Sequence, residues 1–358
     1  MNVHVAGRWV LPPLSMGEFA PDFAAPTRMN PKYHFSTLGG RYVLLGFVPE
    51  AAEAAALAAY QAIRSHFDDT TLCAFFVTPR ADFDDTPPDQ TPGLRWFLDP
   101  AGAVRAKYGP EPGWFLLDPT LRVMDRAPLE APQTLFARVA GLPPPGDHAG
   151  TPLVAPVLIA PRVFEPELCR RLIAYYEAEG GQLSGVMRDI EGRTVGVFDG
   201  MKRRRDVSIA DPGLRAELVD RLQRSLLPMI RRTFHFDATR LERYLVACYD
   251  AAEGGYFHPH RDNQALGTAH RRFAVSINLN SEEFEGGDLR FPEFGPRTYR
   301  PPTGGAVVFC CSLLHEATPV TRGRRYAFLP FLYDEAGEAV RQENADKLDL
   351  TPAPRDSR

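Results

Sequence analysis

The first half of the chain alternates apolar runs with a helical pattern. RYVLLGFV at 41–48 and TTLCAFFVTP at 70–79 are apolar almost throughout, as in strands buried on both faces. Residues 49–67 between them are rich in alanine and begin with proline, which is typical of a helix start. Strand, helix and strand in this order predict a parallel α/β unit. A further helix-like segment and a pair of strands complete it, at 96–109 and 113–126.

The second half opens with helical periodicity and continues in short strands. Leu168 and Leu172 share a face of an amphipathic helix at 163–180, and leucine recurs every fourth residue at 211–234 until Pro228 kinks or ends that helix. Short runs between glycine-rich turns then predict strands at 242–249, 255–261, 272–280, 287–291, 297–300, 305–311, 316–321 and 324–333. This succession is typical of a jelly roll of two sheets.

A stretch dense in proline and glycine, GLPPPGDHAGTP at 141–152, has no apolar periodicity and separates the halves. We therefore expect an α/β domain followed by an α+β domain. The boundaries that we predict are 1–145 for the first domain, 146–155 for the linker, 156–340 for the second domain and 341–358 for a polar C-terminal tail.

Composition narrows the classes of protein that fit. With 44% hydrophobic and 24% charged residues in 358, the chain suits two globular domains. A net charge of −4 gives no general attraction to nucleic acid or to an anionic membrane, so we expect neither as a partner. There is no apolar run of about 20 residues and no signal-like N-terminus, which indicates a cytoplasmic protein. Five cysteines without a CxxC motif indicate reduced thiols.

Three residues of the second half have the composition of a metal site. His260 and Asp262 form an HxD motif, and positions i and i+2 of an extended segment project to the same side. His315 follows on another predicted strand. Two imidazole nitrogens and one carboxylate on one side of a metal leave the other side open, as in non-haem Fe(II) oxygenases. We therefore predict that these three side chains bind Fe(II).

Arg325 lies in the apolar run RYAFLPFLY and is therefore expected to point inward. A buried guanidinium needs an anionic partner, and its planar fork suits a carboxylate. A dicarboxylate could bind the iron at one end and Arg325 at the other, and the simplest is 2-oxoglutarate. Arg324 should face the opposite way, and Arg322 lies in a turn, so both are predicted to be solvated.

The same stretch resembles the prolyl-hydroxylase-type family of 2-oxoglutarate and Fe(II)-dependent dioxygenases. The matching motifs are ACYDAAEGGYFHPHRDN with Tyr249 and Tyr256, FEGGDLRF at 284–291 and HEATPVTRGRRY at 315–326. The resemblance covers roughly the last 200 residues and implies a double-stranded β-helix braced by helices. It also implies Fe(II), 2-oxoglutarate and O2, with ascorbate left open as an addition.

The resemblance further implies an enzyme that hydroxylates a substrate and releases succinate and CO2. In this family, Tyr249 would contact the co-substrate beside Arg325, and Asn278 would supply another contact. Tyr249 as an ordinary core tyrosine is the alternative. Tyr256 is predicted either to contact substrate or to pack. The primary substrate stays unidentified, because a protein side chain, an amino acid and a small metabolite all fit.

The first half resembles the peroxiredoxin branch of the thioredoxin-like fold. The motifs are GEFAPDF at 17–23, LDPAGAVRAKYG at 98–109 and WFLLDPTLRVMD at 114–125. Peroxiredoxins have a reactive cysteine at the start of the helix after the first buried strand, where this chain reads PEAAEAAAL. Peroxidase activity is therefore not expected. Cys73 lies among apolar strand residues and is interpreted as a small buried hydrophobic side chain.

Residues 184–209 are polar, rich in glycine and basic from Lys202 to Arg205. We interpret them as a solvated loop, because charge runs usually are solvated. The alternative is a loop that covers the substrate, in which Arg203 to Arg205 would favour an anionic or polar substrate.

Other functions stay open. His258 and His260 form an HxH pair, which suits a metal-binding cupin, but no glutamate follows at the spacing that cupins use. A 2-oxoglutarate-sensing protein without oxygenase turnover is a further alternative. The first domain could instead serve interaction, substrate presentation or formation of a homodimer.

Overall fold

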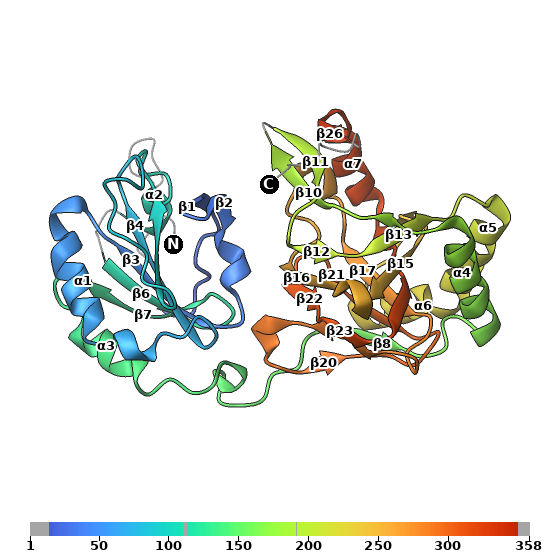
Figure 1. Ribbon diagram of the computed structural model, residues 1–358, viewed down its shortest axis with the longest axis horizontal. Helices are drawn as coiled ribbons and strands as arrows, with labels where there is room; N and C mark the ends of the chain where they lie inside the picture. The colour runs from blue at the N-terminus through green and yellow to red at the C-terminus, as the bar shows by residue number, and fades with distance from the viewer. Residues whose placement is uncertain (1–13, 110–112, 191, 350–358) are drawn as a thin grey trace. The chain divides into compact units, whose positions relative to one another are not determined.

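The computed structural model describes residues 14–109, 113–190 and 192–349. The chain divides into two compact units, one of residues 1–154 with 292–296 and the other of residues 155–291 with 297–358. Figure 1 shows the elements of each unit. In the part of the chain described, no helix has both the length and the apolar character needed to cross a membrane.

The first unit is built on one mixed sheet with the order β5-β4-β3-β6-β7. Its strands are β3 (Tyr42–Phe47), β4 (Leu72–Thr78), β5 (Leu94–Leu98), β6 (Gly113–Leu117) and β7 (Val123–Pro128). The expected parallel pairing of β3 with β4 is confirmed, and β6 and β7 run antiparallel. The remaining elements are β1 (Ala24–Thr27), β2 (Asn30–His34), α1 (Glu53–Gln61), α2 (Arg105–Tyr108) and α3 (Gln133–Val139), and α1 is shorter than the predicted helix.

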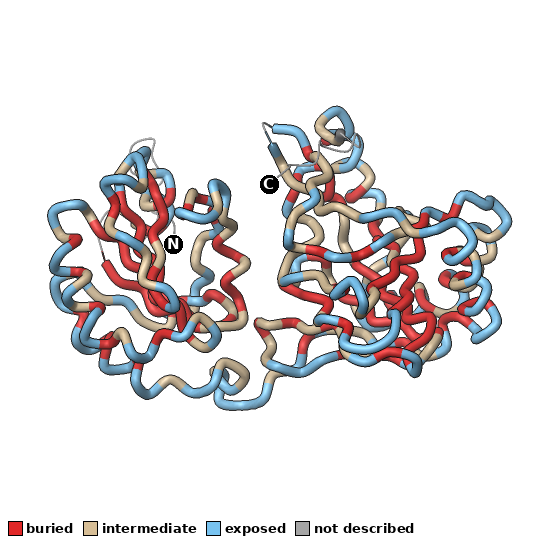
Figure 2. The backbone as a smooth tube through the Cα atoms, viewed as in Figure 1, coloured by how far each residue is buried: buried red, intermediate tan, exposed pale blue. Residues whose placement is uncertain are grey.

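Strand β4 is buried along its whole length because hydrophobic clusters cover both faces of the sheet. Figure 2 colours the backbone by burial and shows the buried stretches of this unit in red. Cys73 and Phe75 point into one cluster, and Phe76 points into the other. This alternation is the period of two expected of a strand. Trp96 and Trp114 are fully buried in the same cluster as Phe76.

The second unit contains two principal sheets. One has the order β14-β25-β17-β24-β15-β13-β9, with β21 paired to β17 and β8. Its strands are β8 (Leu158–Ala160), β9 (Gln182–Leu183), β13 (Arg205–Ser208), β14 (Arg240–Glu242), β15 (Leu245–Asp250), β17 (Phe273–Asn278), β21 (Ala306–Cys310), β24 (Arg324–Phe328) and β25 (Phe331–Tyr333). The other has the order β12-β16-β22-β19-β20. Its strands are β12 (Lys202–Arg203), β16 (Tyr256–His260), β19 (Leu289–Arg290), β20 (Thr298–Tyr299) and β22 (His315–Ala317), and a separate pair joins β18 (Glu285–Gly286) to β23 (Val320–Arg322).

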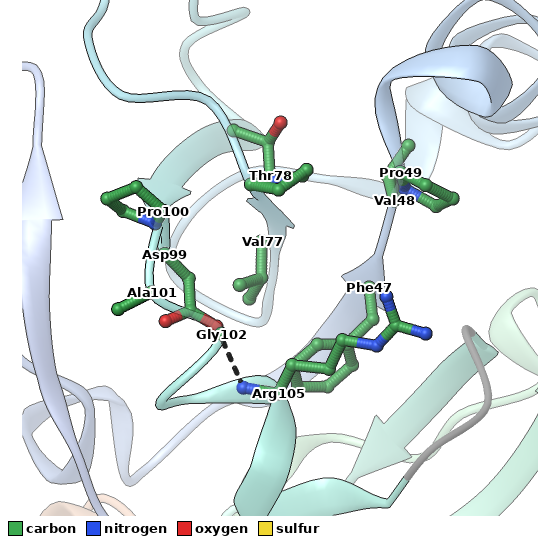
Figure 3. A pocket seen from close by; sticks show the side chains of 11 residues that line it. Phe47, Val48, Pro49, Val77, Thr78, Asp99, Pro100, Ala101, Gly102 and Arg105 are labelled. Carbon is green, nitrogen blue, oxygen red and sulfur yellow. Dashed lines mark hydrogen bonds between the residues drawn. The ribbon is translucent and has the colours of Figure 1, made fainter.

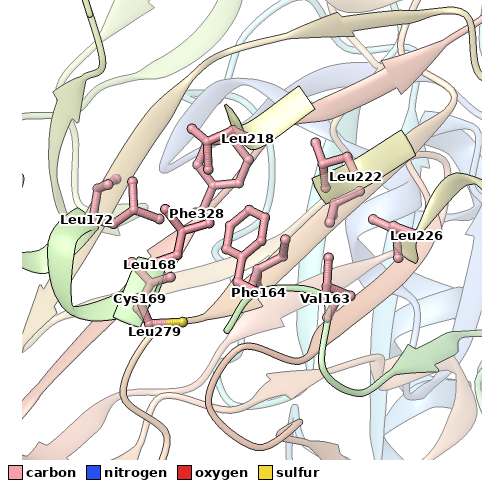
Figure 4. Close-up of a cluster of buried hydrophobic side chains, with 14 of the residues drawn as sticks. Val163, Phe164, Leu168, Cys169, Leu172, Leu218, Leu222, Leu226, Leu279 and Phe328 are labelled. Carbon is pink, nitrogen blue, oxygen red and sulfur yellow. The ribbon is translucent and has the colours of Figure 1, made fainter. Parts of the chain in front are cut away.

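Strand β15 separates two cores. Val246 and Cys248 pack in a large cluster with α4 (Pro166–Glu179) and α5 (Pro212–Ser225), which Figure 4 shows in close-up. Leu245 and Tyr249 instead join a smaller cluster that includes Ala317 of β22. The smaller cluster therefore lies between the two sheets. The predicted helix 211–234 is broken at Leu226, where α6 (Leu227–Phe234) begins with Pro228 in its first turn.

The interpretation of residues 184–209 as a solvated loop is wrong. The segment forms a hairpin of β10 (Val186–Ile190) and β11 (Arg193–Val197), followed by β12 and β13. Lys202 and Arg204 are buried, whereas Arg203 and Arg205 are exposed. The reason is the alternation of side chains in extended backbone, which turns every second basic residue inward.

The expected boundary of a polar tail at residue 341 falls within a helix. Helix α7 spans Glu335–Glu343, and β26 (Leu348–Asp349) then pairs with β11 in parallel. Residues 350–358 of the expected tail lie outside the described residues.

Candidate metal centre

His260, Asp262 and His315 come together in the second unit. Strands β16 and β22 are antiparallel neighbours, and His260 lies directly opposite His315 in their register. The Nε2 atom of His260 is 3.5 Å from Asp262 Oδ1, and Nε2 of His315 is 3.3 Å from Asp262 Oδ2. One nitrogen or oxygen atom from each residue lies within 4.8 Å of the others. This spacing suits a single metal ion.

Backbone carbonyls orient both imidazole rings. The Nδ1 atom of His260 bonds to the carbonyl oxygen of His258 at 2.8 Å, and that of His315 bonds to the carbonyl of Leu313 at 3.0 Å. A carbonyl oxygen can only accept, so Nδ1 carries the proton on each ring. Each Nε2 then presents its lone pair on the side of Asp262, which is the arrangement of a metal-binding histidine.

The protonation states suit a metal as well. Burial and the neighbouring His315 lower the pKa of His260 to about 4, so its ring is neutral near neutral pH. Burial raises the pKa of Asp262, but the two imidazoles outweigh it and hold that pKa well below its usual value. Near neutral pH, Asp262 is therefore ionised and His260 is neutral, so a metal ion can bind both without displacing a proton.

Two local details differ from the sequence argument. His260 is the last residue of β16, and Asp262 lies in the turn that follows, where its N–H donates to the carbonyl of Cys311. The turn, rather than strand alternation, brings its carboxylate to the histidines. The pairing of β16 with β22 is irregular between Phe257 and His260. His258 is exposed and lies outside the group formed by His260, Asp262 and His315.

Arg325 is buried, with 2% of its surface exposed. Its Nε donates to Asn278 Oδ1 at 3.2 Å and its Nη2 to Ser276 Oγ at 2.8 Å, while the guanidinium lies 5.2 Å from the ring centre of Tyr249. Among the described residues its hydrogen-bond acceptors are an amide and a hydroxyl oxygen, and no carboxylate is one of them. Its partners are therefore neutral, and burial lowers its pKa.

Asn278 and Tyr256 both form hydrogen bonds to backbone carbonyls. Asn278 contacts Arg325 directly and also donates to the carbonyl of Pro301. Tyr256 donates its hydroxyl proton to the carbonyl of Gly200. Arg322 and Arg324 are exposed, as expected, and form surface ion pairs.

Steric crowding next to Arg325 explains why the FEGGDLRF motif has two glycines. Gly286 and Gly287 have φ angles of +70° and +66°, which favour glycine. A Cβ at Gly286 would lie 2.1 Å from the carbonyl oxygen of Pro319. A Cβ at Gly287 would lie 2.7 Å from a methyl group of Val320 and 3.2 Å from Cδ of Arg325. Side chains here would therefore displace the turn or the arginine.

Sequence reasoning missed the inward-facing basic residues of 184–209 and their acidic partner. Lys202 lies on β12 beside a ligand-bearing strand, Asp206 lies on β13 in the other sheet, and Arg204 lies between them. Arg204 donates to Tyr249 Oη at 3.3 Å and to Asp206 at 2.7 Å. The signal that could have found them is the period of two in KRRRD, which puts Lys202, Arg204 and Asp206 on one face.

The first unit has a pocket of about 250 Å³ at the ends of β3, β4 and β5 (Figure 3). Its lining includes Pro49, Thr78, Asp99 and Arg105 but no cysteine. Asp99 accepts bonds from the backbone N–H of Arg105 and holds the start of α2. Cys73 is buried elsewhere in the strand, and burial raises its pKa to about 12. A thiolate nucleophile is therefore not available at this pocket.

Comparison with known proteins finds relatives of the second unit. Residues 244–333 match the 2OG-Fe(II) oxygenase superfamily. The chain is 40% identical over 91 residues to a PKHD-type hydroxylase of Pseudomonas fluorescens, covering 23% of this chain and 39% of that protein. It is 30% identical over 160 residues to a PKHD-type hydroxylase of Acidovorax ebreus, covering 40% of this chain and 70% of that protein. A solved prolyl-4-hydroxylase of Pseudomonas putida is 20% identical, with a TM-score of 0.38 over 52% of this chain and 95% of its own.

The matched segment contains the three clustered metal-ligand candidates as well as Tyr249 and Arg325. The class of protein is thus that of the 2OG-Fe(II) oxygenases. The chain belongs to the 2OG-Fe(II) oxygenase superfamily, with PKHD-type hydroxylases among its relatives. It spans about two-fifths of the length of the Pseudomonas fluorescens relative.

Proposed function

We propose that the protein is a 2-oxoglutarate- and Fe(II)-dependent dioxygenase that hydroxylates its primary substrate and releases succinate and CO2. The observation that carries this proposal is the convergence of two oriented imidazoles and one carboxylate. The same unit contains a buried arginine whose hydrogen-bond partners among the described residues are neutral. A cupin-like metal protein has no need of the arginine. A protein that only senses 2-oxoglutarate would share the arginine, and turnover separates it from an enzyme.

The donor set fits ferrous iron. His260, Asp262 and His315 would hold the ion through Nε2, a carboxylate oxygen and Nε2, since both Nδ1 atoms are already bonded to carbonyls. When bound, Fe(II) with 2-oxoglutarate and O2 supplies the oxidising power for hydroxylation. The protein supplies the binding, the orientation and a site from which water is largely excluded.

Arg325 would bind the carboxylate of 2-oxoglutarate that is remote from the iron. Ser276 and Asn278 accept from two of its nitrogens and thereby fix the plane of the guanidinium. Tyr249 would contribute its hydroxyl proton to the same carboxylate. Arg204 donates to the oxygen of that hydroxyl, so the proton of Tyr249 is left to point elsewhere.

For the first unit we propose a thioredoxin-like fold without peroxidase activity. The parallel β3-β4-β5 sheet with antiparallel β6 and β7, and a pocket at the strand ends, support the fold. The absence of cysteine from the pocket lining supports a role in interaction rather than in thiol chemistry.

The test of the oxygenase is the His260→Ala variant. Succinate formation from 2-oxoglutarate with Fe(II) and ascorbate should fall by at least about 100-fold, because one of three iron ligands is lost. His258→Ala is the matched control: this histidine lies two residues away and is exposed, so its variant should keep wild-type turnover. Equal turnover of His260→Ala and the wild type would refute the assignment of the site.

A further inference from the structure

A second group of charged side chains lies beside the metal centre, and of its members only Arg204 has a role described above, through its bond to Tyr249. It consists of Lys202, Arg204 and Arg243 around the single carboxylate of Asp206, and we refer to it as the cationic cluster. Lys202 and Arg204, with 7% and 5% of their surface exposed, lie well inside the protein.

Asp206 is shared by most of the cluster. Its Oδ2 accepts from Arg204 Nη2 at 2.7 Å and lies 3.4 Å from Nη2 of Arg243. It also accepts from the hydroxyl of Ser184 at 2.6 Å, and the ammonium of Lys202 donates to that hydroxyl oxygen at 2.9 Å. Three cationic side chains thus surround one carboxylate.

In this cluster one carboxylate faces three cationic side chains. The Nε atom of Arg204 and the Oδ1 atom of Asp206 are both buried, and neither has a hydrogen-bond partner among the described residues. Burial, with Arg204 adding to it, lowers the pKa of Lys202 well below its usual value. A buried cation without a matching anion is costly, so an anionic ligand would stabilise the cluster.

The cluster reaches the metal centre through one aromatic ring. Lys202 lies opposite Phe257 in the pairing of β12 with β16, and its ammonium is 5.1 Å from the centre of that ring. The Phe257 ring stacks on the imidazole of His260 with a centroid distance of 3.4 Å. A ligand held at Lys202 would therefore lie close to the iron-binding residues.

A second connection runs through Phe331. The guanidinium groups of Arg243 and Arg271 lie 5.5 and 3.9 Å from the centre of that ring. Arg271 Nη1 donates to the carbonyl oxygen of Asp262 at 3.4 Å. The cluster is thus tied to two of the three metal-ligand candidates.

The cluster differs from the co-substrate position. Arg204 and Arg325 both lie near the ring of Tyr249, at 5.7 and 5.2 Å from its centre, but Arg204 lies in the charged network and Arg325 lies among neutral acceptors. One dicarboxylate, bound to iron at one end, has a single remote carboxylate to offer. That carboxylate would satisfy Arg325, so 2-oxoglutarate would supply no anion to the cationic cluster.

We infer that the primary substrate carries an oxyanion, either a carboxylate or a phosphate ester, that binds the cationic cluster while the bond to be oxidised lies toward the iron. This inference rests on the proposed function, because it assigns the substrate of the same site. It narrows the substrate from any hydroxylatable molecule to one with an anionic group near the reacting carbon.

The experiment uses the full chain loaded with Mn(II) and saturated with 2-oxoglutarate. The probes are N-acetylglycine, methyl phosphate and the neutral N-acetylglycinamide, and the signal is the paramagnetic relaxation of their methyl protons in solution NMR. This signal requires binding near the metal. Either anionic probe should bind at least about tenfold more tightly than the amide, since it gains charge-assisted hydrogen bonds. The anion that binds more tightly identifies the source of the oxyanion.

Two variants locate the binding. Lys202→Met and Arg243→Gln should each weaken the anionic probe by about tenfold, through loss of one charged partner. Arg203→Gln is the matched control, because Arg203 is adjacent in sequence but exposed, and it should match the wild type. Relaxation of the methylene protons of 2-oxoglutarate in every variant verifies that the metal centre is intact.

The outcomes separate the two proposals. Relaxation of the 2-oxoglutarate protons without any preference for an anionic probe would overturn the inference and leave the dioxygenase proposal standing. The inference is also overturned if the anion binds only when 2-oxoglutarate is absent, or if Lys202→Met and Arg243→Gln bind it as the wild type does. Failure of 2-oxoglutarate itself to bind near Mn(II) would refute the proposed function.

Discussion

Replacement of Arg325 by alanine tests the co-substrate site most directly. The guanidinium is buried and bonded to Ser276 and Asn278, so no other cation can move into its place without displacing these partners. Truncating one partner of a buried charge pair costs about 2 to 5 kcal/mol. Taking about 3 kcal/mol and 1.4 kcal/mol per factor of ten, the dissociation constant of 2-oxoglutarate should rise roughly 150-fold.

The assay is calorimetric titration of 2-oxoglutarate into the Mn(II)-loaded protein, together with the KM for 2-oxoglutarate in succinate formation. Arg325→Lys keeps the charge but loses the fork, so its loss should be smaller, about tenfold. Arg324→Ala is the matched control, because that neighbouring side chain is 52% exposed and pairs with Glu177 and Asp250. A dissociation constant for Arg325→Ala within about threefold of the wild type would refute the reasoning, since a buried charge pair is worth far more than that.

Three further predictions concern stability and reactivity. Burial raises the pKa of Glu242, but Arg271 and His270 outweigh it and hold that pKa at about 2, below the ordinary value of 4.5. Ionised Glu242 therefore stabilises the folded state above pH 4.5, and this contribution, up to about 3 kcal/mol, is lost as the pH falls toward 2. In urea unfolding between these pH values, the free energy of unfolding of Glu242→Gln should change less with pH than that of the wild type. Leu222→Ala should lower the free energy of unfolding by about 3 kcal/mol, because Leu222 is buried in the cluster of Figure 4, and an unchanged urea midpoint would contradict this packing. A thiol reagent should modify Cys310 alone in the native protein, because the other four cysteines are buried, and should modify all five after unfolding. Rapid modification of a second cysteine in the native protein would contradict this burial.

Much of the second unit could be predicted from the sequence, because the pattern of neighbouring residues is enough to predict its strands and turns. Alternating apolar residues in β15 and β24 determine which side chains face the interior, and this brings Tyr249 and Arg325 to the same region. The glycine pair at 286 and 287 marks a turn that only glycine accommodates without strain. The parallel pairing of β3 and β4 followed from their continuous apolar character.

What could not be anticipated depends on pairing between distant segments. Lys202 is buried only because β12 pairs with β16, more than fifty residues later, and Asp206 only because β13 pairs with β15. The period of two in KRRRD indicates that Lys202, Arg204 and Asp206 share a face, but nothing in the local sequence indicates which strands pair with this segment and bury that face. The position of Asp262 likewise depends on a backbone hydrogen bond to Cys311, which no sequence spacing reveals.

The tryptophans allow each half of the protein to be followed separately. All three occur before residue 115, and Trp96 and Trp114 are enclosed in the core of the first unit. Selective excitation of indole fluorescence therefore monitors melting of the first unit alone, whereas circular dichroism records both units. If iron and co-substrate raise the melting temperature by circular dichroism and leave the fluorescence transition in place, the halves unfold as independent cooperative blocks.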